Sequence, residues 1–157
     1  MDATSVAAVV GAVGSGLMAG ILFAFSSFVM RALDTIEAGP RILAMQQINQ
    51  KIVNPLFVLI FAGTGLISVY LMIAGVDDST AGDRAARLGA LLYLLGVIIV
   101  TMTRNIPLNT RLDRVDPDDE EAASVWEWYR DRWLRWNHLR TAASVGAAAC
   151  FCLANSL

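Results

Sequence analysis

Residues 5–30 read SVAAVVGAVGSGLMAGILFAFSSFVM and contain no ionisable side chain. A helix of about 20 apolar residues can cross the roughly 30 Å hydrocarbon core of a bilayer, so this stretch predicts a membrane-spanning helix. The residues before it, Met1-Asp2-Ala3, supply no basic segment, and the apolar stretch is too long for a signal peptide. The first helix therefore places the chain in a membrane and is expected not to be cleaved off as a signal peptide.

Three more stretches predict spans, at about residues 55–76, 85–103 and 141–157. The last is short and rich in alanine, but the segment 120–140 before it has helical periodicity and would extend it through the membrane interface. The composition agrees, because 17% of the 157 residues are charged, against about 25% in soluble domains. We predict an all-α integral membrane four-helix bundle that forms a single domain over residues 1–157.

The basic residues are distributed unevenly among the connections. Ten of the twelve lie in the two longer ones, after the first and third spans, and two lie between the second and third spans. The positive-inside rule then predicts a multi-pass protein of a bacterial inner membrane, with both termini outside and the longer connections in the cytoplasm. The bilayer is the expected partner, and no basic tract suggests nucleic acid.

Residues 40–53, after the first span, predict a short amphipathic helix. Proline at its start is a favourable first-turn residue. One face carries apolar side chains at helical spacing: Ile42, Met45, Ile48 and Ile52. Such a helix lies at the interface or folds back on the bundle, and in either case Asn49 shares its inner side. Asn54 then precedes Pro55 at the start of the second span.

The third span is followed by Asn105-Ile106-Pro107-Leu108-Asn109. Proline lacks a backbone donor and disfavours helix in the residue before it, so we expect a break or kink here. At membrane depth the freed backbone groups need partners. Asn105 and Asn109 can supply them, or can face a bound molecule; the pattern leaves both readings open.

The segment 120–140 predicts a tryptophan-rich helix. Its stripe at three- and four-residue steps consists of Trp126, Tyr129, Trp133, Trp136 or Asn137, and Arg140. An aromatic belt with snorkelling arginine explains single members of this stripe. It explains less well why Asn137 and Arg140 share it, and an inward arginine at the membrane edge indicates a functional site. Arg140 could stabilise a phenolate, enolate or carboxylate, and His138, about 100° around the helix, is either an interfacial residue or a proton-transfer group.

Small residues recur at every fourth position of the first span: Ala8, Ala12, Gly16, Gly20 and Ala24. They allow close helix packing, either within the bundle or in a homodimer. Residues 116–121 are mostly acidic and are expected to form a solvated turn and helix start. With a single histidine in the chain, no metal site is predicted.

Three motifs resemble the anthrone oxygenase-like family of small membrane proteins. They are Met45-Gln46-x-Ile48-Asn49 with Asn54-Pro55, Asn105-x-Pro107-x-Asn109, and Trp133-x-x-Trp136-Asn137-x-x-Arg140. The resemblance implies a four-helix membrane fold and, from characterised fungal members, oxidation of an anthrone to an anthraquinone with dioxygen. The positions that match the family pattern are Asn49, Asn105, Asn109, Trp133, Trp136, Asn137 and Arg140.

These considerations give a hypothesis for the site. The catalytic candidates are Asn109, Asn137, His138 and Arg140, and the substrate-binding candidates are Asn49, Asn54, Asn105, Trp133 and Trp136. No cofactor motif is present, so we expect a cofactor-independent oxygenase in which the enolate of a planar, lipophilic phenolic or anthrone-type substrate reacts with dioxygen. No strong base is evident. The alternatives are a protein that binds or transports a lipid, quinone or small amphiphile, and a structural subunit of a membrane assembly.

Overall fold

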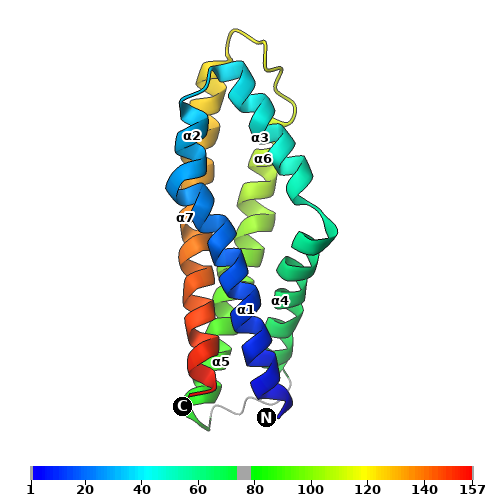
Figure 1. Ribbon diagram of the computed structural model, residues 1–157, viewed down its shortest axis with the longest axis vertical. Coiled ribbons are helices and arrows are strands. Elements are labelled where there is room, and N and C mark those ends of the chain that lie inside the picture. Colours follow the sequence, from blue (N-terminus) through cyan, green and yellow to red (C-terminus); the bar gives the residue numbers. More distant parts are fainter. Residues whose placement is uncertain (1, 74–78, 157) are drawn as a thin grey trace.

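The computed structural model describes residues 2–73 and 79–156, and within these ranges the secondary structure is helical, with no strand. The predicted all-α bundle is therefore confirmed. The long helices run side by side along the molecule, and the N- and C-terminal ends lie together at one end (Figure 1). The predicted short helix after the first span lies at the opposite end.

Two rods of the bundle contain wide π-helical turns between their α-helical parts. The first rod is α1 (Ala3–Ala24), η1 (Phe25–Val29) and α2 (Met30–Asp34). The other is α5 (Ala81–Leu91), η2 (Leu92–Ile99), η3 (Thr101–Asn105) and α6 (Ile106–Leu112). The remaining helices are α3 (Ala38–Ile52), α4 (Pro55–Ile73) and α7 (Ala122–Ala154).

Three helices of the described chain are long and apolar enough to cross a membrane: Ala3–Asp34, Pro55–Ile73 and Ala81–Leu112. They correspond to the first three predicted spans, except that the predicted end of the second, residue 76, lies outside the described residues. The fourth crossing, predicted at 141–157, remains a prediction, and residue 157 also lies outside the described part. Its helix α7 is less apolar because the turn before residue 141 carries Asn137, His138 and Arg140.

The tryptophan-rich segment and the alanine-rich segment form one helix, α7, as the sequence predicts. At about 1.5 Å per residue its 33 residues extend roughly 50 Å. Figure 1 shows α7 running the length of the bundle beside α1. Because its buried positions follow the helical repeat, one stripe faces the other helices throughout: Trp126, Tyr129, Trp133, Asn137, Arg140, Ala143, Ala147 and Phe151.

Side-chain caps set the beginnings of α5 and α4. Thr80 and Asp83 form a capping box, in which Thr80 Oγ1 accepts from the Asp83 N–H and the Asp83 carboxylate accepts from the Thr80 N–H. This cap begins α5 four residues before the predicted start of the third span. Asn54 Oδ1 accepts from the Phe57 N–H at 3.0 Å, which starts α4 at Pro55 as predicted.

Of the break or kink predicted at Pro107, the break is not found, and the helix instead changes its winding. The Ile106 N–H donates to the carbonyl of Thr101, five residues back, and closes a π-helical turn. Pro107 then occupies the first turn of α6, where the absence of its backbone N–H costs little stability. The rod therefore remains continuous from Ala81 to Leu112.

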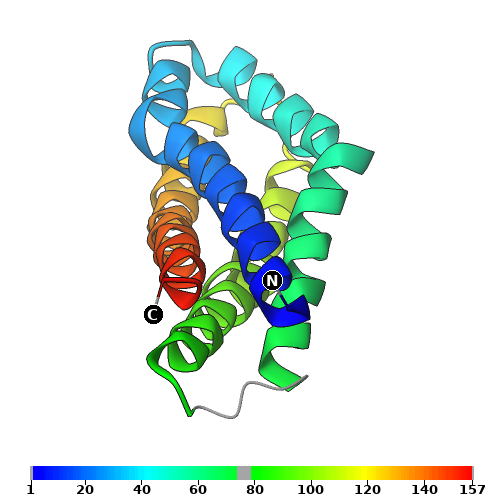
Figure 2. The same cartoon turned by 60° about the horizontal axis from the view of Figure 1, so that its bottom comes forward.

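The amphipathic helix α3 folds back over the bundle, one of the two predicted arrangements. Figure 2 shows α3 crossing from the α2 end of the first rod to the start of α4. Ile42 and Met45 are fully buried against α6 and α7. Gln46 fixes this position, since its amide nitrogen Nε2 donates to the carbonyls of Leu112 at 2.9 Å and Val115 at 3.0 Å.

Only part of the small-residue stripe of α1 packs against other helices of the same chain. Ala8 is buried, but a side chain added at Gly16 or Gly20 would meet no atom within 4 Å. The close contacts inside the bundle are made instead by Gly11 and Gly14, which face α7 and α4. A homodimer through the outward part of the stripe remains a prediction.

Candidate functional site

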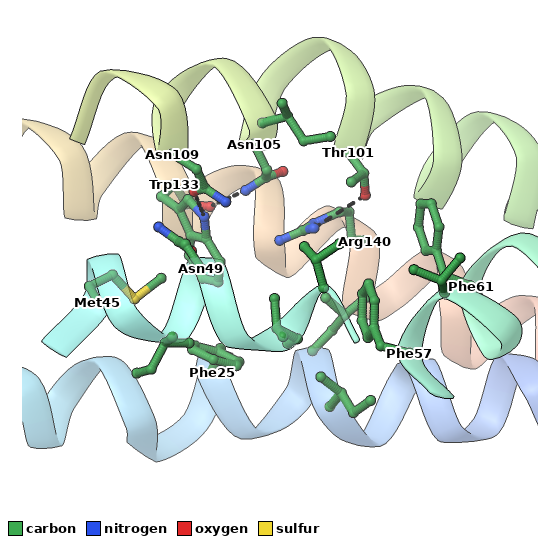
Figure 3. A pocket seen from close by; sticks show the side chains of 17 residues that line it. Phe25, Met45, Asn49, Phe57, Phe61, Thr101, Asn105, Asn109, Trp133 and Arg140 are labelled. Carbon is green, nitrogen blue, oxygen red and sulfur yellow. Dashed lines mark hydrogen bonds between the residues drawn. The ribbon is translucent and has the colours of Figure 1, made fainter. Parts of the chain in front are cut away.

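A cavity of about 220 Å³ lies inside the end of the bundle that α3 covers. This volume lies below the range of about 300–1,000 Å³ that is usual for small-molecule sites, so the cavity suits one compact molecule. Its walls come from the first rod, α3, α4, the η3–α6 rod and α7 (Figure 3). Most of the lining is apolar and includes Ile21, Leu22, Phe25, Ile48, Ile52, Phe57 and Phe61.

The polar part of the wall contains five of the residues selected from the sequence: Asn49, Asn105, Asn109, Trp133 and Arg140. They come from α3, η3, α6 and α7, and Thr101 of η3 joins them. Figure 3 shows Arg140 extending toward Thr101, with the three asparagines and Trp133 farther along the same cavity. Segments distant in sequence therefore build one amphipathic site.

Arg140 is the charged group of this wall and is 7% exposed. Its Nη2 donates to Asn137 Oδ1 at 2.8 Å, and its Nη1 donates to Thr101 Oγ1 at 3.2 Å. The guanidinium carbon lies 5.3 Å from the centre of the Trp133 ring. Among the described residues no acidic side chain pairs with Arg140, and its buried Nε has no acceptor. A buried cation with only neutral partners favours an anionic ligand.

Asn137 is fully buried beside Arg140 but does not line the cavity. Its Nδ2 donates to the Leu22 carbonyl and to Ser26 Oγ, both at 2.8 Å, while its Oδ1 accepts from Arg140. Ser26 belongs to the wide turn η1, and Leu22 lies just before it. Since both ends of the amide have partners, Asn137 positions the guanidinium rather than contacting a ligand.

Asn109 has a fixed amide orientation. Its Oδ1 accepts from the Tyr129 hydroxyl at 3.0 Å and from Trp133 Nε1 at 2.9 Å. Tryptophan Nε1 can only donate, so the atom facing it must be oxygen, and the amide nitrogen of Asn109 is left for another acceptor. Burial raises the pKa of Tyr129, and the neighbouring Asn49 amide opposes that rise only in part. Tyr129 therefore remains a neutral donor.

Asn105 and Asn49 have amide atoms that are not satisfied. Asn105 Nδ2 donates to the Trp133 carbonyl at 3.4 Å, but its buried Oδ1 has no partner. The buried Nδ2 of Asn49 makes no hydrogen bond with the described residues, although the amide lies beside the Tyr129 hydroxyl. An unsatisfied buried polar group costs about 1–3 kcal/mol. Together with Nε of Arg140, these atoms offer two donors and one acceptor to a molecule in the cavity.

Three other candidates lie outside the cavity wall. Asn54 is exposed and caps α4. Trp136 is half-buried and stacks under Arg104, whose guanidinium carbon is 4.8 Å from the ring centre. His138 is exposed, with Nδ1 3.0 Å from Ser26 Oγ. The wall as described contains no imidazole or carboxylate.

Sequence reasoning missed Thr101 and the phenylalanines of the apolar wall. Phe25 packs against Trp133 with ring centres 5.4 Å apart, and Phe57 and Phe61 stack on each other at 5.8 Å. In an apolar span a phenylalanine facing a cavity has the same sequence signature as one facing lipid. The described residues contain no group of three or more histidine, cysteine, aspartate or glutamate side chains placed to hold a metal ion.

Comparison with protein families matches residues 44–150 to the anthrone oxygenase model, which covers well over half of the chain. The chain belongs to the anthrone oxygenase family. The matched region contains every polar residue of the cavity wall, from Asn49 to Arg140, whereas the first rod lies outside it. Searches of curated proteins and of solved structures found no match.

Proposed function

We propose that this anthrone oxygenase family member oxidises a planar, lipophilic phenolic or anthrone-type substrate with dioxygen, without a cofactor. The observation that carries the proposal is Arg140, a buried guanidinium without an acidic partner among the described residues, in the wall of a largely apolar cavity. Family membership supports the same chemistry. The substrate is a flat ring system with one ionised oxygen.

The apolar and the polar parts of the lining fit the two parts of such a substrate. The ring lies along the apolar lining near Phe57 and Phe61, where aromatic packing and apolar burial stabilise it. The oxygen lies at Arg140, where a charge-assisted hydrogen bond from Nε satisfies an atom that is otherwise unpaired. Farther along the cavity, the free Oδ1 of Asn105 accepts from a hydroxyl of the substrate, and the amide nitrogen of Asn109 donates to one of its oxygens.

The reaction uses the acidity of the methylene of an anthrone. Loss of one methylene proton gives an enolate, and Arg140 stabilises its oxyanion. The enolate carbon forms a bond to dioxygen, which is reduced to a hydroperoxide that takes up a proton. Loss of water from this hydroperoxide forms the second carbonyl, so anthrone and dioxygen give anthraquinone and water. The described wall contains no carboxylate or imidazole, so the enzyme selects the substrate anion rather than forming it with a side-chain base.

The test is dioxygen uptake and product absorbance with purified protein and anthrone. Arg140→Met should lower the catalysed rate by about 100-fold or more, which is typical for loss of an oxyanion donor. Arg135→Met is the matched control, because Arg135 is exposed on the same helix, and its rate should be unchanged. Wild-type uptake no faster than spontaneous oxidation would contradict the proposal.

A second candidate is a binding or transport protein for a lipid, quinone or small amphiphile. The lack of a base in the described wall favours it, because binding needs only the cavity and Arg140. Tight binding of 2-hydroxyanthraquinone, without dioxygen uptake on anthrone, would select this candidate over the oxygenase.

We also propose a bacterial inner-membrane location with both termini outside. The chain ends lie together at one end of the bundle, while the arginine-rich connections lie toward the other (Figure 1). Reporter fusions at the two termini and in the connection 113–121 test this orientation. The termini should report the periplasm and the connection the cytoplasm.

A further inference from the structure

The cavity reaches the surface through residues that are themselves apolar and exposed. Val53, between α3 and α4, is 66% exposed, Val58 of α4 is 46% exposed, and Ile106 of α6 is 42% exposed. All three line the cavity, so they mark its mouth. The polar lining atoms that lack partners, on Asn49, Asn105 and Arg140, are themselves buried. The site is therefore apolar at its entrance and polar in its interior.

The mouth lies on the side of the bundle. α4 packs on α1, α5 and η2, and the cavity separates its first turns from η3 and α6. Other exposed residues of α4 and η3, such as Leu59 and Met102, are also apolar. Both flanking helices belong to candidate membrane spans. Val58 is three residues beyond Pro55, about 4.5 Å into the span at 1.5 Å per residue.

We infer that this mouth is a lateral portal, through which the cavity takes its ligand from the bilayer rather than from water. The chemistry of the ligand rests on the proposed function, whereas the entry route is inferred from the exposed apolar residues at the mouth. A flat molecule with a polar edge concentrates at the membrane interface, as tyrosine and tryptophan side chains do. From there it crosses only apolar surface to bring its oxygen to Arg140. A molecule arriving from water would have to lose its hydration at the same apolar rim.

The test uses 2-hydroxyanthraquinone, a flat and oxidation-stable ring with one ionisable oxygen. Protein in lipid nanodiscs is saturated with the dye and mixed rapidly with excess dye-free vesicles. Recovery of tryptophan fluorescence then reports release into lipid. Val58→Phe/Ile106→Phe should narrow the portal and slow release about tenfold, while Kd changes less than about threefold, because entry and exit slow together. Val58→Ala/Ile106→Ala should widen the portal and speed release.

The matched control is Leu59→Phe/Met102→Phe. It adds the same bulk to the same two rods at exposed positions that do not line the cavity, so release should keep the wild-type rate. Release at the wild-type rate from both mouth variants, or failure of the wild-type protein to bind the dye, would overturn the portal proposal. Portal-dependent release without dioxygen uptake on anthrone would leave the portal standing and remove the oxygenase proposal.

Discussion

The two ends of the bundle are packed in different ways. At the end that holds the termini, small residues bring the helices together: Gly96 faces Ala143 directly, and Gly89 lies 3.0 Å from the Phe151 ring, measured from an added Cβ. At the other end, large aromatic side chains of α7 pack against α2, α3 and α6. We call the first end the closed end, because its glycines bring the helices into direct contact, whereas the cavity lies between its core, at Leu22, and the aromatic end.

The difference shows how one bundle combines close helix packing at one end with a cavity at the other. Close backbone approach is the usual way in which membrane helices associate. At the aromatic end bulky rings lie between the helices, and the remaining space is lined by Arg140 and three asparagines. The wide turns η1 and η3 lie at this end, where π-helical turns commonly mark functional sites. The closed end thus supports the fold, and the aromatic end carries the site.

The largest expected effect is at the closed end. Gly96→Leu would drive its Cβ into the Ala143 side chain, where neither backbone can move away easily. Overpacking of this kind should lower the free energy of unfolding by about 3 kcal/mol. Thermal unfolding in detergent measures the loss. Gly16→Leu is the control, because an added Cβ there meets no atom within 4 Å, and its change should stay within about 0.5 kcal/mol.

Asn109→Ala tests the hydrogen-bonded network of the aromatic end. It leaves the Tyr129 hydroxyl and Trp133 Nε1 without their shared acceptor, which should lower the free energy of unfolding by about 2 kcal/mol. Asn54→Ala is the comparison, since it removes an exposed helix cap and should lower stability by about 1 kcal/mol. Equal losses in the two variants would mean that the network contributes no more than a cap.

Tyr129→Phe should have a smaller effect that depends on pH. It removes one hydrogen bond, worth about 1 kcal/mol. Because burial raises the pKa of Tyr129 above its ordinary value of about 10, the stability from the neutral phenol is complete below that pH and is lost as pH rises through the folded value. The difference in unfolding free energy between wild type and variant should therefore shrink above about pH 10. A constant difference up to higher pH would contradict this account.

Much of the fold could be predicted from the sequence because it follows from local patterns. Long apolar stretches predict the first three spans, and Pro55 predicts the start of α4. The stripe of α7 also places Arg140 on the face of Tyr129 and Trp133, because a helical repeat fixes which side chains share a face, but only the structure shows that this face points inward. The stripe could not decide between Trp136 and Asn137, which are adjacent; the structure buries Asn137.

The remaining features depend on contacts between distant segments. Asn54 has the same side chain as Asn49, yet it caps a helix at the surface while Asn49 lines the cavity. The position of Asn54 directly before Pro55 is a local signal for a helix cap, whereas the cavity beside Asn49 is formed only by segments distant in sequence. The π-helical turn before Pro107 likewise depends on a choice of backbone partners that sequence spacing does not show. Thr101 enters the site only because Arg140 of α7 reaches it.

The smallest expected effect on stability is that of Arg140→Met. Methionine removes a buried charge that no acidic side chain of the described chain compensates, and this gain offsets the two lost hydrogen bonds. The free energy of unfolding should stay within about 1 kcal/mol of the wild-type value, as buried charges are often replaced at little cost. A loss of several kcal/mol would mean that Arg140 is structural.

The most direct test of the central claim, that Arg140 holds an ionised oxygen of the ligand, is the absorption spectrum of bound 2-hydroxyanthraquinone. The measurement is made at a pH at which the free dye is neutral. We predict that the dye bound to the wild-type protein absorbs as its anion, and that the dye bound to Arg140→Met absorbs as the neutral form. A neutral spectrum on the wild-type protein, or an anionic spectrum that persists in Arg140→Met, would contradict the assignment of Arg140 as the anion-binding group.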